Sequence, residues 1–195
     1  MLKDILKDYN IILASGSPRR QQFFKELEID FEIRLKPVEE NYPSSLAGVE
    51  ITNFLAELKA AAFEGELKTR DILITSDTIV WHEGKALEKP KDAAQALEMI
   101  ASLCGKTHKV ITSVCFKTPS EVRTVHAITH VTFGTLSKDE IVHYIDRYRP
   151  FDKAGAYGIQ EWIGLIGVEY IEGSYFNVVG LPTHLVYQTL CEMAE

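Results

Sequence analysis

Two spacings of hydrophobic residues alternate along the first part of the chain. Consecutive, β-branched-rich runs at 11–14 and 72–80 are typical of buried strands. Between them, hydrophobic residues recur every three to four positions over about 49–63, which predicts a helix. Alternating strands and helices indicate an α/β fold, which we expect to be a mixed, twisted sheet flanked by helices, with a central cleft at the carboxyl ends of strands.

The same patterns predict the remaining elements. In chain order these are a half-buried strand at 30–35, a turn at 81–85, a helix from Asp92 to Leu103, an antiparallel strand pair at 107–117 and 122–136, a helix after the Ser137 capping box, an irregular segment at 150–165, a hairpin of 168–171 with 175–179, and a helix after Pro182. The sequence contains no linker long enough to separate independent domains. We therefore expect residues 1–195 to form one domain, or two closely joined lobes around the cleft.

The stretch from residue 11 to 20 reads as strand, tight loop and helix. Ser17 suits the N-cap of that helix, and Pro18 suits its first position because it has no N–H to leave unpaired. Such a junction directs backbone N–H groups and the positive end of the helix dipole at one point. Arg19 and Arg20 follow at once, although cations are mildly unfavourable there. The stretch indicates either an anion-binding site or a solvated helix start with two surface arginines.

The overall charge argues that any anion site is local. The net charge of −7 and the pI near 5.4 exclude general binding to nucleic acid or to anionic lipid, which requires a basic surface. Three widely spaced cysteines and the lack of a long hydrophobic run predict a reduced, cytoplasmic protein that does not enter a membrane.

One carboxylate and two lysines stand out as candidate chemistry. Asp77 falls in the second half of the 72–80 strand, where we expect the strand end to present it. A carboxylate there needs an arginine or a hard cation such as Mg²⁺ as its partner. Lys59 borders a hydrophobic stripe and Lys89 precedes a proline, so that together with the arginines they could neutralise a polyphosphate, or each could be an ordinary solvated side chain.

Six segments of the chain, taken in order, resemble the motifs of the Maf (septum formation inhibitor-like) family. They run from Leu13 to Arg20, Ser76 to Val80, Leu87 to Pro90, Gly105 to Val110, Ala156 to Gln160 and Ile171 to Pro182. The resemblance implies a hydrolase of nucleotide metabolism, a nucleoside triphosphate pyrophosphatase. Such an enzyme splits its substrate between the α and β phosphates, with the help of a divalent metal cation, Mg²⁺ or Mn²⁺.

The resemblance also implies roles for single residues. Asp77 corresponds to the catalytic carboxylate and, with Glu40, to the metal-binding pair. The residues that would hold the triphosphate are Ser15, Ser17, Arg19, Arg20, Lys59 and Lys89. Arg19, Thr78 and Gln160 match the branch that prefers dTTP and UTP, and an amide can both donate to and accept from a pyrimidine edge. Two departures concern Glu39, where aspartate is usual, and Glu161-Trp162, where small residues usually follow the glutamine and shape the base pocket.

Two other functions stay open at this stage. One is a pyrophosphatase for 7-methyl-GTP or a modified nucleotide. The other is a regulator of septum formation that binds nucleotide without turnover. For the enzyme, the resemblance implies house-cleaning of nucleotide pools by a homodimer.

Overall fold

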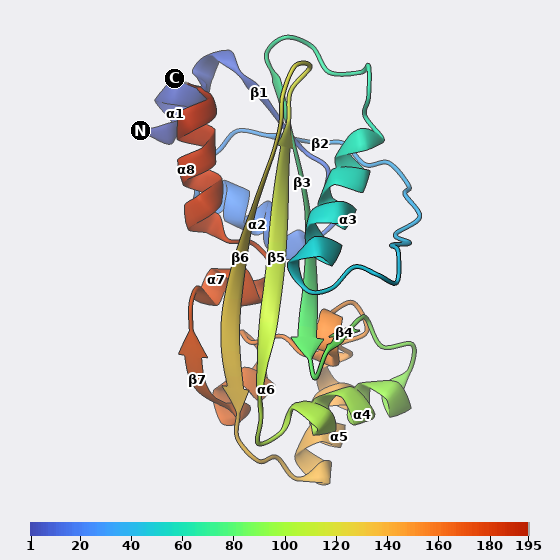
Figure 1. Cartoon of the computed structure of the whole chain (residues 1–195). Coiled ribbons are helices and arrows are strands. Elements are labelled where there is room, and N and C mark those ends of the chain that lie inside the picture. Colours follow the sequence, from blue (N-terminus) through green and yellow to red (C-terminus); the bar gives the residue numbers. More distant parts are fainter. Residues whose placement is uncertain (195) are drawn as a thin grey trace. The chain divides into compact units, whose positions relative to one another are not determined.

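The computed structural model describes residues 1–194, in which seven strands form one mixed sheet (Figure 1). The strand order is β2-β1-β3-β5-β6-β7, and β4 pairs with β3. The strands are β1 (Asn10–Leu13), β2 (Glu32–Ile33), β3 (Asp71–His82), β4 (Lys85–Leu87), β5 (Thr107–Lys117), β6 (Val122–Phe133) and β7 (Val168–Glu172). The α-helices are α1 (Leu2–Ile5), α2 (Pro18–Glu26), α3 (Val49–Ala61), α4 (Ala93–Leu103), α5 (Lys138–Tyr148), α6 (Trp162–Gly167), α7 (Tyr175–Val179) and α8 (Thr183–Met193), and the short 3₁₀ helices are η1 (Leu6–Asp8) and η2 (Ala154–Ala156). The predicted fold class, a mixed α/β sheet with helices, is confirmed.

The chain divides into two compact units. The first contains Met1–Asp77, Thr112–Ala127 and the segment from Gly180 onward, and the second contains Thr78–Ile111 and Ile128–Val179. Strands β3, β5 and β6 contribute residues to both units. The organisation of residues 1–195 as a single domain, and the cleft at the strand ends, stay predictions.

In the first unit, parallel strands bring their carboxyl ends to one edge. β1 pairs in parallel with β2 and with β3, so that Leu13 lies opposite both Ile33 and Ile74. The strands pack on α3 through a hydrophobic cluster of Ile12, Ala56, Ala60, Phe63, Leu73 and Cys115. The Thr75 hydroxyl of β3 donates to the Ala56 carbonyl of α3 at 2.6 Å, which fixes the helix along the strand. This packing determines the position of Lys59, the predicted site residue on α3.

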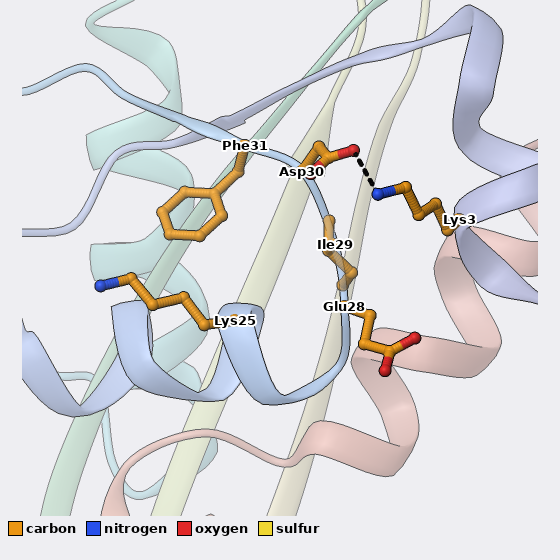
Figure 2. A pocket seen from close by; sticks show the side chains of 6 residues that line it. All are labelled: Lys3, Lys25, Glu28, Ile29, Asp30 and Phe31. Carbon is orange, nitrogen blue, oxygen red and sulfur yellow. Dashed lines mark ion pairs between the residues drawn. The ribbon is translucent and has the colours of Figure 1, made fainter.

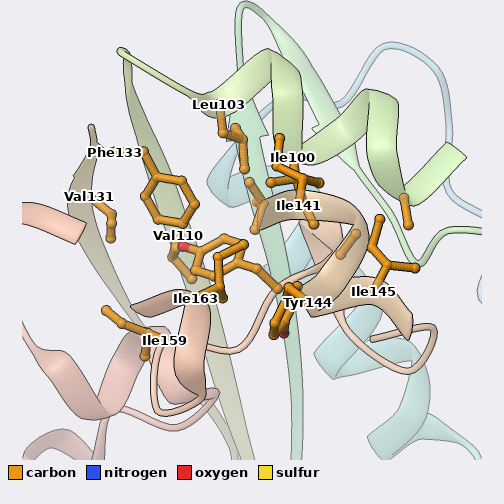
Figure 3. Packing of buried hydrophobic residues seen from close by; sticks show 14 residues of the cluster. Ile100, Leu103, Val110, Val131, Phe133, Ile141, Tyr144, Ile145, Ile159 and Ile163 are labelled. Carbon is orange, nitrogen blue, oxygen red and sulfur yellow. The ribbon is translucent and has the colours of Figure 1, made fainter. Parts of the chain in front are cut away.

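The second unit has its own hydrophobic core, and Figure 3 shows its packing. Helices α4 and α5 contact each other, and fully buried residues of both, such as Ile100 and Tyr144, pack with Val131 and Phe133 of β6. β7 pairs antiparallel with β6. Each unit therefore buries enough hydrophobic surface to hold its own site residues in place.

The helix starts predicted from capping patterns are confirmed. The Ser17 side chain accepts the Arg20 N–H at the start of α2, and the Asp92 side chain accepts the Gln95 N–H at the start of α4. Ser137 and Glu140 form the predicted capping box of α5. These local hydrogen bonds depend on few residues, so that sequence patterns identify them well.

Several predicted elements differ from those observed. The predicted half-buried strand at 30–35 is reduced to Glu32–Ile33 at the edge of the sheet, and both residues are exposed. Trp81 and His82 belong to β3, and the turn is confined to Glu83 and Gly84, both with positive φ. Within the segment predicted to be irregular, residue 162 already begins α6.

The predicted hairpin of 168–171 with 175–179 is wrong. β7 pairs with β6 instead, and Tyr175–Val179 form the helix α7. The buried side chain of Asn177 explains the difference, because its amide donates to the Val110 carbonyl at 3.0 Å and to the Thr129 hydroxyl at 2.9 Å. A helical turn is needed to direct this side chain toward β5 and β6.

Among the described helices, none combines the length and hydrophobicity that a membrane-spanning segment requires.

The core of the second unit contains a buried histidine that carries a prediction about pH. His108 is 2% exposed, and its Nε2 shares a hydrogen bond of 2.7 Å with the Tyr157 hydroxyl. Burial, followed by the charge of His82, lowers the pKa of His108 from 6.5 to about 3. The folded protein therefore keeps this ring neutral at pH values where the unfolded chain protonates it.

We expect the His108→Gln variant to lose part of the acid sensitivity of the wild type. Below pH 6.5 the unfolded chain protonates His108, whereas the folded protein does not until about pH 3. This difference lowers the free energy of unfolding as the pH falls toward about 3, by up to about 1.4 kcal/mol per pH unit. Urea unfolding between pH 4 and pH 8 measures this slope. Equal slopes for the two proteins would contradict a neutral, buried His108.

Candidate functional site

The junction between β1 and α2 is held in shape by its own side chains. Ser15 is buried, and its hydroxyl accepts the Ser17 N–H at 3.3 Å. The amide of Gln21, one turn into α2, donates back to the Ser15 carbonyl at 3.1 Å. The loop therefore presents the start of a nine-residue helix in a fixed orientation, as an anion-binding junction requires.

Arg20 connects this junction to β3 and to the segment before α8. Its Nε donates to the Gly180 carbonyl at 2.9 Å, and its Nη1 donates to the Ser76 carbonyl at 2.8 Å. Burial lowers the pKa of the guanidinium, whereas the nearby Asp77 carboxylate raises it. The Arg20 side chain thus binds backbone carbonyls of two segments, and its positive charge lies near Asp77.

The centre of the site is a lysine shared by two carboxylates. Lys59 Nζ lies 2.7 Å from Asp77 Oδ1 and 3.1 Å from Glu40 Oε2. The Asp77 and Lys59 side chains are 10% and 18% exposed, whereas Glu40 is 50% exposed. The structure therefore brings together three predicted site residues from α3, β3 and the loop after β2.

Asp77 does not end its strand, contrary to the prediction. β3 continues to His82, because its later residues pair with β4. The parallel pairing with β1 stops earlier, at Leu13 and Ile74, and the Ala14 N–H makes a last hydrogen bond to the Ile74 carbonyl. Asp77 thus lies just beyond the carboxyl end of the parallel part of the sheet.

The donor set near Lys59 fits a cation that shares its ligands with a substrate. The described part of the chain has no group of three or more histidine, cysteine, aspartate or glutamate side chains suited to a metal ion. Asp77 and Glu40 supply carboxylate oxygens around one point, which the Lys59 ammonium fills. Mg²⁺ is often bound by one or two carboxylates together with phosphate oxygens and water.

Three other predicted residues, Thr78, Lys89 and Gln160, belong to the second unit. Thr78 is half-buried in β3, and Lys89 is exposed just before the buried Pro90. The neighbouring Glu88 carbonyl accepts the Gly155 N–H at 3.2 Å. Gln160 is exposed, and Arg19 of the first unit is half-buried in the first turn of α2.

A pocket of about 410 Å³ lies elsewhere in the first unit (Figure 2). It is lined by Lys3, Lys25, Glu28, Ile29, Asp30 and Phe31. Its marked ion pair joins Lys3 Nζ and Asp30 Oδ2 at 3.3 Å. No predicted site residue lines this pocket, which we therefore do not include in the candidate site.

Sequence reasoning missed the residues that support the site. Gly180 and Ser76 act through their carbonyl groups and Gln21 through its amide, and none of these contacts follows from residue type. The sequence gives one indication of Ser76 and Gly180, because both lie within the segments that resemble the family motifs. In the second unit, Glu161 contacts two buried residues, Tyr144 and Lys153, which the sequence did not indicate.

The chain matches a known protein family over most of its length. Residues 10–193 match the family model described as Maf-like protein. A relative from Flavobacterium johnsoniae, named dTTP/UTP pyrophosphatase, is 65% identical over 190 residues, which cover 97% of this chain and 98% of the relative. Proteins of the same name from Christiangramia forsetii and Bacteroides fragilis are 58% and 50% identical, covering 99% and 96% of this chain and 98% of each relative.

The matched region includes every residue of the candidate site, from Ser15 at the β1–α2 junction to Gln160 in the second unit. The ordered motifs and the family model indicate the same family over this region, and the mixed α/β sheet is the fold expected from the sequence. The chain belongs to the Maf-like protein family.

Proposed function

We propose that this protein is a nucleoside triphosphate pyrophosphatase that hydrolyses dTTP and UTP to the monophosphate and pyrophosphate. The observation that carries the proposal is the cluster of Asp77, Lys59 and Glu40 beside Arg20 and the start of α2. Opposite charges alternate within it, so that it can receive both an anionic triphosphate and a cation. The names of the relatives support the same substrates.

The triphosphate would bind to the cationic side of this cluster. Lys59, whose ammonium lies between two carboxylates, would donate hydrogen bonds to the phosphate oxygens, and Asp77 and Glu40 would be the residues that hold a divalent cation. The first turn of α2 supplies backbone N–H groups and Arg19. Arg20 keeps the junction in place through the backbone and adds its charge, and Lys89 of the second unit would act as a further point charge.

Asp77 would act on the attacking water. The water oxygen bonds to the α-phosphorus as the bond from that phosphorus to the α–β bridging oxygen breaks. The water proton passes to the Asp77 carboxylate, and the bridging oxygen leaves with pyrophosphate. A divalent cation held by Asp77, Glu40 and the phosphates would neutralise charge and lower the pKa of bound water. Arginine and lysine charges favour the electron-rich transition state.

Selection of the base is assigned to Arg19, Thr78 and Gln160. Gln160 is exposed, so that its amide is available to a ligand, and it can match both donor and acceptor atoms of a uracil or thymine edge. Purine and cytosine edges present a different pattern. This assignment rests on the family resemblance at these positions.

The cellular proposals follow from the same resemblance. We propose a cytoplasmic enzyme that removes unwanted nucleotides, uses Mg²⁺ or Mn²⁺ and forms a homodimer. Exposed hydrophobic side chains on α6, β7 and α7, including Leu165 at 82% and Tyr170 at 61%, support a contact with a second copy. The net charge of −7 gives no support for binding to nucleic acid.

A substrate panel tests the proposed function. Pyrophosphate release with Mg²⁺ or Mn²⁺ is measured for dTTP, UTP, CTP, GTP, ATP and 7-methyl-GTP. We expect fast turnover of dTTP and UTP and slow turnover of the purine nucleotides. A preference for 7-methyl-GTP would overturn the base assignment, and nucleotide binding without any turnover would overturn the enzyme proposal.

Replacement of the central carboxylate tests the mechanism. We expect Asp77→Asn to lower kcat for dTTP by roughly 10²–10⁴-fold, because an amide cannot accept the water proton. The amide oxygen can still accept the hydrogen bond from Lys59, so that the variant should fold. Steady-state kinetics and thermal unfolding measure both effects.

Glu64→Gln is the matched control for this variant. Glu64 pairs with Lys117 at 2.6 Å in the same unit, but its side chain is 76% exposed and lies outside the site. It should retain wild-type turnover. Wild-type turnover in Asp77→Asn would refute the role of Asp77.

A further inference from the structure

The segment that carries Gln160 is a hydrogen-bonded turn. The Glu161 N–H donates to the Gly158 carbonyl at 3.0 Å, which leaves Ile159 and Gln160 at the centre of the turn. Ile159 is buried and Gln160 is exposed. The turn thus anchors one central residue in the core and presents the other outward.

A single hydroxyl group joins the two ends of this turn. The Gly158 N–H donates to the Tyr144 hydroxyl oxygen at 3.0 Å, and the same hydroxyl donates to Glu161 Oε2. Tyr144 is fully buried in α5, where Figure 3 shows it in the same cluster as Ile159 and Ile163. Burial, and then the hydrogen bond to Glu161, raise the pKa of Tyr144, which keeps its proton available for donation.

The second oxygen of Glu161 is also engaged. Lys153 Nζ lies 3.1 Å from Glu161 Oε1 and 2.8 Å from Asp152 Oδ1. Lys153 is 8% exposed, so that its charge requires these partners. The carboxylate of Glu161 is therefore held from both sides and cannot move without leaving a buried donor unpaired.

Close packing leaves the turn little room. A Cβ added at Gly158 would lie 2.9 Å from the Glu161 carboxylate carbon, and one at Gly164 would lie 1.8 Å from the Ile159 carbonyl oxygen. The Gly164 N–H in turn donates to the Glu161 carbonyl at 2.9 Å. Glycines at both positions allow α6 to start directly against the turn.

We propose that Tyr144 and Glu161 are positioning residues for base selection, because together they hold the turn from which Gln160 meets the pyrimidine. The inference rests on the proposed function and deepens it. Glu161 and Tyr144 fix the turn through a network of side-chain contacts that also includes Lys153. Neither residue needs to touch the substrate to act in this way.

The test compares selectivity among matched variants. Tyr144→Phe removes only the bridging hydroxyl, and Tyr148→Phe on the same helix is its control, because the Tyr148 ring stacks on Tyr144 and no hydrogen bond of its hydroxyl is part of the network. Glu161→Gln keeps an oxygen for Tyr144 and loses the charge toward Lys153, and Glu161→Ala removes both contacts. For each variant kcat/KM is measured for dTTP, UTP and GTP, together with thermal unfolding.

We expect kcat/KM for dTTP and UTP to fall by roughly tenfold or more in Tyr144→Phe and Glu161→Ala, because a small displacement of a positioned group is costly. The slow turnover of GTP should change little, so that the ratio of dTTP to GTP falls. Glu161→Gln should be intermediate, and Tyr148→Phe should keep the wild-type ratio. Should Tyr144→Phe fail to fold, the comparison of Glu161→Gln with Glu161→Ala carries the test.

Two results would overturn the inference. One is wild-type kcat/KM for both substrates in the folded variants, and the other is an equal loss of kcat/KM on both, which would mean a purely structural role; either leaves the ratio of dTTP to GTP unchanged. Both are distinct from failure of the proposed function, in which the wild-type protein itself would not hydrolyse dTTP.

Discussion

The candidate site depends on one ammonium group that two carboxylates share. Asp77 is largely buried, and a buried carboxylate without a partner is costly; removal of one partner from such a pair typically costs about 3–5 kcal/mol. Lys59 meets this requirement from α3 and at the same time holds Glu40 at the same point. This contact forms only because α3, β3 and the loop after β2 each place one of the three side chains at the same point. The cluster is thus assembled before any substrate arrives.

In each unit, side-chain hydrogen bonds hold a segment that we propose to contact the substrate. In the first unit, Arg20 and Gln21 bind backbone carbonyls and fix the loop that would meet phosphates. In the second unit, the Tyr144 hydroxyl fixes both ends of the turn that carries Gln160. In the second unit the supporting Tyr144 is buried, whereas Gln160, which is assigned to the ligand, is exposed. Rigid support of this type reduces the ordering that a ligand would otherwise have to impose.

Local patterns in the sequence predicted much of the fold. The α/β class, the long helices and the N-cap residues follow from spacing and capping chemistry, which involve residues close together in the chain. The residues of the Asp77 and Lys59 pair were identified as candidates, but the contact between them was not. Tertiary contacts explain the errors: β4 extends β3 beyond Asp77, and the buried amide of Asn177 requires a helix where β-rich sequence predicted a strand. The supporting carbonyl groups were not predictable, because every residue type carries one.

We propose that Asp77 would hold a divalent cation together with the triphosphate, in place of Lys59. Calorimetry measures binding of a UTP analogue that cannot be hydrolysed between the α and β phosphates, to the wild type and to Asp77→Asn, with and without Mn²⁺. We expect Mn²⁺ to tighten binding to the wild type by about tenfold or more, a typical coupling between two ligands, and Asp77→Asn to lose this dependence. Equal affinities with and without Mn²⁺ for the wild type, or an unchanged dependence in Asp77→Asn, would contradict it.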